Sequence, residues 1–127
     1  MKKKLALDTR YGNESYTAIV KVIQLRKSMR DYVLAAMKNA ADSGMPVNRP
    51  LWWDFPADKE TWGIMQAYMF GPDYLVSPVT EMGARSWSVY LPAGVSWAYH
   101  FNGTVYVGGQ TISVSTPLDE FPLFKRQ

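Results

Sequence analysis

The stretch WAYHFNGTVYV, residues 97–107, places two β-prone runs on either side of Asn102-Gly103. Asn-Gly between such runs is the strongest short-range signal for a β-hairpin, because both central residues of a type I′ turn need positive φ angles. The stretch therefore predicts a hairpin with strands over Trp97–Phe101 and Thr104–Val107.

Four more segments around this hairpin have the period-two alternation, or the β-branched and aromatic composition, that is typical of strands. They are Tyr74–Val79, Trp87–Leu91, Thr111–Ser115 and Phe121–Phe124. Pro122 lies inside the last of them, and a proline inside a strand favours an edge position. Residues 73–127 are therefore predicted to form an antiparallel, β-sandwich-like domain.

Residues 1–72 have a different, mixed character. Apolar residues recur every three or four positions from about residue 14 to 42, which predicts an amphipathic helix. Gly44 followed by Pro46 supplies a helix end. Residues 1–13 show no such period and are expected to be irregular.

A short strand and a second helix are predicted to follow the long helix. Residues 46–52 are mostly apolar and are interrupted by prolines, which indicates a buried strand leading into a loop. Asp58 can cap a helix over about 58–70, in which Trp62, Met65 and Met69 share one face. The order helix, strand, helix and then an antiparallel β domain predicts the α+β fold class.

The composition excludes several kinds of site. Apolar residues make up 47% of the 127 residues, which is enough for a packed core. Without cysteine there is neither a disulfide nor a thiolate metal site, and the single His100 excludes a multi-histidine zinc site. We therefore expect no metal and no cofactor.

The net charge of +3 includes Lys2, Lys3 and Lys4, and the remaining chain is neutral. A nucleic-acid partner, which needs a basic surface, is therefore not expected. Asp8 and Arg10 interrupt the apolar run after the lysines, so no signal peptide is indicated. No stretch approaches the roughly 20 apolar residues of a membrane span. We expect a soluble chain without a membrane contact, and its localisation stays unknown.

Eight segments, in order along the chain, resemble motifs of one enzyme family. Among them, Gly44–Leu51 resembles the family's Gly-x-Pro-Val-x-Arg-Pro-Leu strand, and Leu75–Val79 resembles its Leu-Val-Ala/Ser-Pro-Val strand. The others are Leu25–Tyr32, Phe55–Trp62, Gln66–Gly71, Val89–Gly94, Gly108–Thr111 and Pro117–Phe124. By these motifs, residues 11–126 resemble glycoside hydrolase family 31, the family of α-glucosidases and α-xylosidases.

The resemblance implies that residues 1–72 are the C-terminal piece of a (β/α)8 barrel and that residues 73–127 are the β-sandwich after it. Retaining glycosidases need two carboxyl groups about 5–5.5 Å apart. In this family both are aspartates in motifs that the sequence does not contain, so no catalytic residue is carried over. The resemblance thus implies a fragment of a retaining α-glycosidase, acting on α-glucosidic or α-xylosidic bonds, that is inactive alone.

Three carboxylates of the chain itself are candidates for catalysis. Asp54 follows a predicted barrel strand, at the end where barrel enzymes place their active sites, and Asp58 or Glu60 could be its partner. The favoured interpretation is structural, with Asp54 paired with Arg49 or bound by backbone N–H groups, and Asp58 capping its helix. A small active glycosidase that uses Asp54 is the alternative.

Tryptophans are candidates for substrate binding, because aromatic rings stack on sugar rings. Trp52 and Trp53 are adjacent, so on a strand only one could line a site, and packing is the favoured interpretation for both. Cross-strand packing is likewise favoured for Trp97 in the hairpin. A non-catalytic carbohydrate-binding β module is therefore a further alternative.

The expected partners follow from the resemblance. Carbohydrate would be bound through the parent enzyme. A barrel strand without its neighbours has two unpaired edges, and the long helix has an uncovered apolar face. We therefore expect the isolated chain either to self-associate, for example as a homo-oligomer, or to rearrange its helices over the β-sandwich.

Overall fold

The computed structural model describes residues 2–127, with side chains from Arg10 onward. Two helices come first, α1 (Lys2–Ser28) and α2 (Arg30–Ser43). A strand and two short helical turns follow: β1 (Asn48–Pro50), α3 (Leu51–Asp54) and the 3-10 helix η1 (Lys59–Gly63). The remaining strands are β2 (Tyr68–Phe70), β3 (Tyr74–Val76), β4 (Ser86–Leu91), β5 (Ser96–Tyr99), β6 (Val105–Val107), β7 (Gln110–Ser115) and β8 (Leu123–Arg126).

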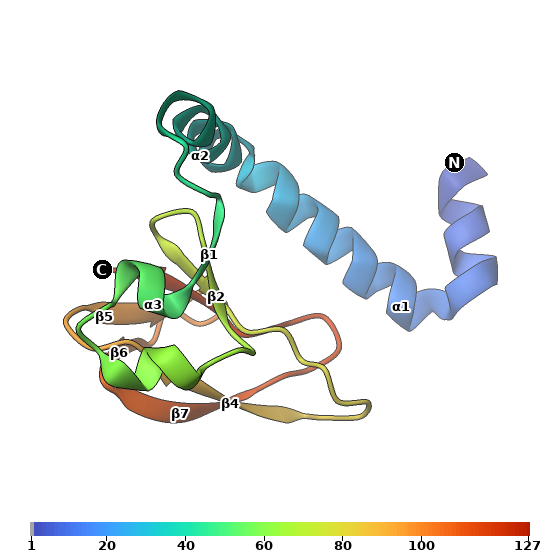
Figure 1. Ribbon diagram of the computed structural model, residues 1–127. Coiled ribbons are helices and arrows are strands. Elements are labelled where there is room, and N and C mark those ends of the chain that lie inside the picture. Colours follow the sequence, from blue (N-terminus) through green and yellow to red (C-terminus); the bar gives the residue numbers. More distant parts are fainter. Residues whose placement is uncertain (1) are drawn as a thin grey trace.

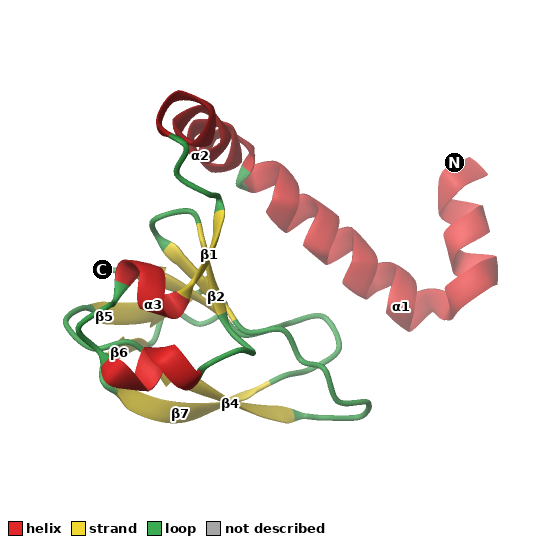
Figure 2. Ribbon diagram, in the orientation of Figure 1, coloured by secondary structure: helices red, strands yellow, loops and turns green. Residues whose placement is uncertain are grey.

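The chain combines helices with antiparallel sheets, which confirms the predicted α+β class (Figure 2). The helices α1 and α2 lie to one side of the two sheets, whereas α3 lies against β1 and β2 (Figure 1). No helix within residues 2–127 is long and apolar enough to span a membrane.

The helical part is longer than predicted and is bent twice. Residues 2–11, expected to be irregular, are helical, and Gly12 with a φ of 80° breaks α1 just before the predicted helix start. Met29 separates α1 from α2, so the single helix predicted over 14–42 is two helices (Figure 1). Gly44 ends α2 as predicted, because its φ of 74° is left-handed and its N–H closes the last turn.

The predictions of a strand over 46–52 and a helix over 58–70 are largely wrong. The strand is confined to β1, and the chain then turns into α3. Of the helix predicted over 58–70, only the short 3-10 helix η1 is present. The residues expected to form its last turn form the strand β2 instead. Met69 is fully buried in the sheet while Met65 is 95% exposed, so their helical spacing did not mark a shared buried face. Residues 68–70 are extended because β2 pairs with β1 and with β3, and the spacing of apolar residues does not show this pairing.

Six antiparallel strands form the main sheet, in the order β1-β2-β3-β8-β5-β6, and β4 pairs with β7 in a second sheet. The main sheet continues across residue 73, the predicted domain boundary, because β2 pairs with β3. The core contains the fully buried side chains of Leu51, Met69, Leu75, Leu91, Trp97 and Phe124. Residues from both predicted parts therefore share one core.

β8 is a central strand, not the edge strand that its proline suggested. It pairs with β3 on one side and with β5 on the other. Pro122 lies just before β8, outside the ladder, where its carbonyl accepts a hydrogen bond from the N–H of Ser77 at 3.1 Å. The missing proline N–H therefore costs the sheet nothing.

The predicted hairpin is present, but its turn is of another type. β5 and β6 pair as expected. Gly103 has a φ of 72°, whereas no described residue other than glycine has a positive φ, so Asn102 cannot form a type I′ turn. A longer loop is closed by the N–H of Gly103, which bonds the carbonyl of Tyr99 at 2.8 Å. The side chain of Asn102 instead accepts from the N–H of Thr104 at 2.9 Å.

Tyr32 fastens α2 to the turn between β2 and β3. Its hydroxyl donates to the carbonyl of Phe70 at 2.7 Å and accepts from the N–H of Asp73 at 3.0 Å. Gly71 has a φ of 64°, and a Cβ at this position would lie 2.3 Å from the Tyr32 oxygen, so a larger residue does not fit. Desolvation raises the pKa of Tyr32, which keeps the hydroxyl protonated.

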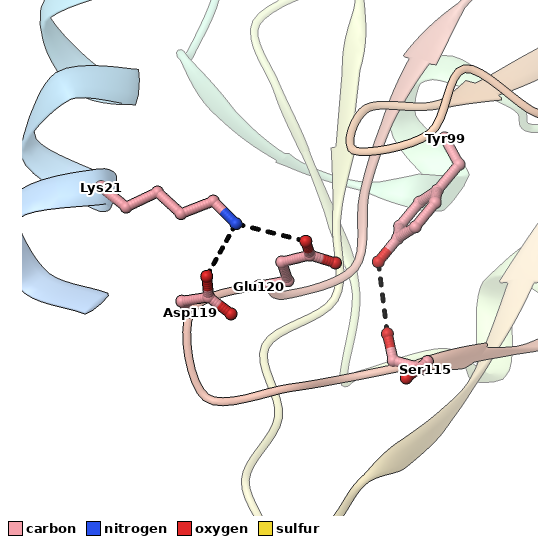
Figure 3. Close-up of polar contacts among 5 residues, drawn as sticks. All are labelled: Lys21, Tyr99, Ser115, Asp119 and Glu120. Carbon is pink, nitrogen blue, oxygen red and sulfur yellow. Dashed lines mark hydrogen bonds and ion pairs between the residues drawn. The ribbon is translucent and has the colours of Figure 1, made fainter. Parts of the chain in front are cut away.

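Lys21 connects α1 to the loop between β7 and β8 (Figure 3). Its Nζ lies 2.8 Å from a carboxylate oxygen of Asp119 and 3.2 Å from one of Glu120. The hydrogen bond from Lys21 lowers the pKa of Asp119. Because these side chains are partly exposed, the contact orients α1 more than it stabilises the fold.

We predict that Tyr32→Phe lowers the free energy of unfolding by about 1–3 kcal/mol, because the variant leaves a carbonyl and an N–H of the β2–β3 turn without their partner. Urea denaturation followed by fluorescence measures this. The control is Tyr11→Phe, at an exposed tyrosine of α1, which should change stability by less than about 0.5 kcal/mol. Equal effects of the two variants would contradict the role assigned to Tyr32.

Candidate functional site

Asp54 forms an ion pair with Arg49, the first of the two structural roles that the sequence suggests for it. Nη1 of Arg49 lies 3.2 Å from Oδ1 of Asp54, and the two side chains are 6% and 15% exposed. Arg49 comes from β1, and the turn of α3 brings Asp54 back beside it. Removing one member of such a pair leaves an uncompensated buried charge, so the pair is a structural requirement of this corner.

The ion pair is enclosed and incompletely bonded. Desolvation raises the pKa of Asp54, although the positive charges of Arg49 and Arg126 act in the opposite direction. Nε of Arg49 and Oδ2 of Asp54 are buried without a hydrogen-bond partner among the described atoms. A raised pKa alone would suit a general acid, but the carboxylate of Asp54 already balances the charge of the buried Arg49 guanidinium.

Asp58 caps η1, as predicted, although the helix is a 3-10 helix. Its Oδ1 accepts from the N–H of Glu60 at 3.2 Å. Its Oδ2 accepts from the hydroxyl of Tyr90 and from the N–H of Ala93, both at 2.8 Å. Desolvation would raise the pKa of Asp58, but these three donors outweigh it and lower the pKa. Desolvation and the bond to Asp58 raise the pKa of Tyr90 to about 12.

The three candidate carboxylates have different surroundings. Asp54 binds Arg49, whereas Asp58 binds groups of β4 and of the turn after it. Glu60 is exposed and lines a hollow of about 570 Å³ beside β4, together with Tyr90, which donates to Asp58. Within the described part of the chain, no group of three acidic or histidine side chains is arranged to hold a metal ion.

Trp97 belongs to the core, so the candidate role in sugar binding is wrong for this residue. It has no exposed surface, and its Nε1 donates to the carbonyl of Pro92 at 3.0 Å. Its ring packs against Phe55, with the ring centres 5.7 Å apart. The favoured interpretation from the sequence, cross-strand packing, agrees with this position, since Trp97 also lies opposite Tyr106 of β6.

Trp52 and Trp53 lie on α3 and not on a strand, so the argument from strand alternation does not apply to them. Their side chains are 38% and 46% exposed, so the packing favoured for both is at best partial. Trp62 of η1, which the sequence placed only on a helix face, stacks on Trp52 with ring centres 5.7 Å apart. The local sequence did not show that Trp62 lies beside Trp52, because the chain reversal between α3 and η1 brings the two rings together.

Known proteins match the chain over most of its length. The model of the glycosyl hydrolase family 31 C-terminal domain matches residues 44–127, which includes β1 and β2. A probable glucan 1,3-alpha-glucosidase of Oryza sativa subsp. japonica is 39% identical over 116 residues, which are 91% of this chain and 13% of that protein. An alpha-xylosidase of Saccharolobus solfataricus is 34% identical over 117 residues, 92% of this chain and 16% of that protein.

A solved structure matches as well. The crystal structure of a GH31 alpha-xylosidase from a soil metagenome, complexed with xylose, superposes with a TM-score of 0.90 at 44% identity. The match covers 92% of this chain and 17% of that one, so the chain spans only a small part of the length of its relatives. Motifs, fold and relatives agree, and the chain belongs to glycoside hydrolase family 31.

Proposed function

We propose that this chain is a structural C-terminal part of a retaining α-glycosidase and that it has no glycosidase activity by itself. One observation carries this proposal: the candidate carboxylates are engaged in structural contacts. Asp54 balances the buried charge of Arg49, and Asp58 accepts hydrogen bonds from three donors. Retaining hydrolysis needs a nucleophile and an acid/base about 5–5.5 Å apart across the scissile bond, and neither residue is free for such a role.

The substrate class of the whole enzyme follows from the relatives. Two of them are named as a glucan 1,3-alpha-glucosidase and an alpha-xylosidase, so α-glucosidic or α-xylosidic bonds are the proposed substrates. The chain corresponds to 13% and 16% of their lengths, so most of a comparable enzyme lies outside these residues. The proposed contribution of this chain is to complete the fold beside the catalytic part.

We predict no turnover of p-nitrophenyl α-glucoside or p-nitrophenyl α-xyloside by the purified chain above the rate of buffer alone. The assay includes Asp54→Asn and, as a matched control, Asp31→Asn at a carboxylate that is 96% exposed. Turnover that disappears in Asp54→Asn and persists in Asp31→Asn would establish the alternative, a small active glycosidase that uses Asp54.

A structural role of Asp58 makes a separate prediction. Its lowered pKa means that the stability from the ionised carboxylate is present above the unfolded pKa of about 3.9 and is lost as the pH falls through the folded pKa. Asp58→Asn should lower the free energy of unfolding at pH 7 by about 1–3 kcal/mol, with a smaller difference from wild type at pH 3. Urea denaturation at both pH values measures this, and a difference that does not depend on pH would contradict it.

The uncovered apolar surface of the helices supports self-association of the isolated chain. α2 has no buried residue, and Leu34 and Met37, three positions apart on one side, are 48% and 57% exposed. Val22 and Ile23 of α1 are also exposed. In the whole enzyme, further polypeptide is the proposed cover of this surface, and in the isolated chain a second copy takes its place.

We predict that light scattering after size-exclusion chromatography gives a mass of at least twice 14.4 kDa for the isolated chain. Leu34→Glu should return it to a monomer, because a charge on the apolar surface opposes its burial. Met82→Glu, on a fully exposed loop residue, is the control and should leave the mass unchanged. A monodisperse monomer of the unmodified chain would contradict self-association.

A further inference from the structure

The turn between β5 and β6 contains an asparagine in a chemically labile position. Of the four asparagines of the chain, only Asn102 is followed by glycine. Asparagine is one of the thermolabile residues, because the backbone nitrogen of the next residue can attack its side-chain amide carbon. Gly103 has no side chain to shield this nitrogen, and both residues of the turn are exposed. The pair therefore combines a reactive sequence with access to water.

The side chain of Asn102 is folded back onto the turn. Its Oδ1 accepts a hydrogen bond from the N–H of Thr104 at 2.9 Å, the arrangement of an Asx-turn. This bond holds the side-chain amide against the backbone that contains the Gly103 nitrogen. The same N–H points at the oxygen on which negative charge develops during an attack on the amide carbon. It therefore stabilises the transition state in the way that an oxyanion donor does.

The surroundings of Gly103 leave room for the reaction. A Cβ at this position would meet no atom within 4 Å other than those of its two neighbours in the chain. The N–H of Gly103 donates to the carbonyl of Tyr99 at 2.8 Å, and this bond opposes the attack because it occupies the nitrogen. The bond must open first. Such local opening costs little free energy in an exposed turn.

We propose that Asn102 of the folded chain is a site of spontaneous deamidation. The Gly103 nitrogen loses its proton and forms a bond to Cγ of Asn102. The bond from Cγ to the side-chain nitrogen then breaks, and this nitrogen takes up a proton and leaves as ammonia. The product is a succinimide ring. Water adds to either of the ring carbonyl carbons, and the ring opens to aspartate or to isoaspartate without any oxidation or reduction.

The modification changes both charge and backbone at this turn. Residues 86–118, which include β4 to β7, contain no aspartate, glutamate, lysine or arginine. A carboxyl group with the ordinary pKa of about 3.9 is ionised at neutral pH, so each converted chain gains a negative charge in this uncharged part. In isoaspartate the backbone also runs through the side-chain carbons, which lengthens the turn. This inference does not rest on the proposed lack of glycosidase activity.

The test is a time course of the full chain in mildly alkaline buffer, which favours loss of the proton from the attacking nitrogen. Ion-exchange chromatography should resolve a species with one additional negative charge. Mass spectrometry of proteolytic fragments should find NH2 replaced by OH at Asn102, as a mixture of aspartate and isoaspartate. Asn13, Asn39 and Asn48 precede residues with side chains and should stay unchanged over the same period.

Two variants and a denatured sample calibrate the result. Asn102→Ser should abolish the gain of charge, because serine has no amide to lose while its hydroxyl still accepts from the N–H of Thr104. The matched control, Asn39→Ser within α2, should leave the conversion of Asn102 unchanged. A parallel sample in urea gives the rate for the unfolded chain. The folded chain should react within about tenfold of that rate, because only a local opening precedes the attack.

Circular dichroism throughout the incubation verifies that the converted chain was folded when it reacted. A rate in the folded chain more than about tenfold below that in urea would overturn the proposal, because the turn would then protect the amide. An Asn102 that stays intact in both samples would overturn it as well. Similar conversion of all four asparagines in the folded chain would refute the role assigned to the turn.

Discussion

The placement of β8 between β3 and β5 holds the main sheet together. β1, β2 and β3 lie on one side of it and β5 and β6 on the other, so the two groups of strands meet only through β8. Phe124 of this strand is fully buried and its ring lies 5.1 Å from that of Tyr99. Without β8, the facing edges of β3 and β5 would lose their backbone partners within an apolar core, which is costly. The candidate site depends on the same sheet, because β1 supplies Arg49, the partner of Asp54.

Elements whose structure is decided locally could be predicted from the sequence. The alternation over 87–91 and 111–115 predicted strands that the structure confirms as β4 and β7, and the helix end at Gly44 was set by its left-handed φ. The segment at 68–70 was misread as helix because it is extended only through pairing on both sides. Pro122 likewise suggested an edge, since local sequence cannot show that the ladder begins one residue later.

In the candidate site, too, some contacts could be predicted from the local sequence and others depend on the tertiary structure. The ion pair of Asp54 with Arg49 and the cap formed by Asp58 could be anticipated from charge and position. The exposure of Trp52 could not, because it depends on α3 replacing the expected strand. The stacking of Trp62 on it depends on a chain reversal that no periodicity records. Trp52, Trp53 and Trp97 were alike candidates for sugar contact, but Trp97 is buried and the other two are exposed, a division that depends on the tertiary structure.

The order in which the strands are synthesised has a consequence for folding. β3 leaves the ribosome well before β8, its partner, and the intervening chain contains β4 to β7. A sheet whose central strand follows its neighbours in the chain cannot close until that strand has been made, and such non-local pairing slows folding. Until β8 arrives, β3 presents an open strand edge that can pair with other chains. Newly made copies of this polypeptide therefore pass through a period in which a chaperone that covers unpaired strands would improve their yield.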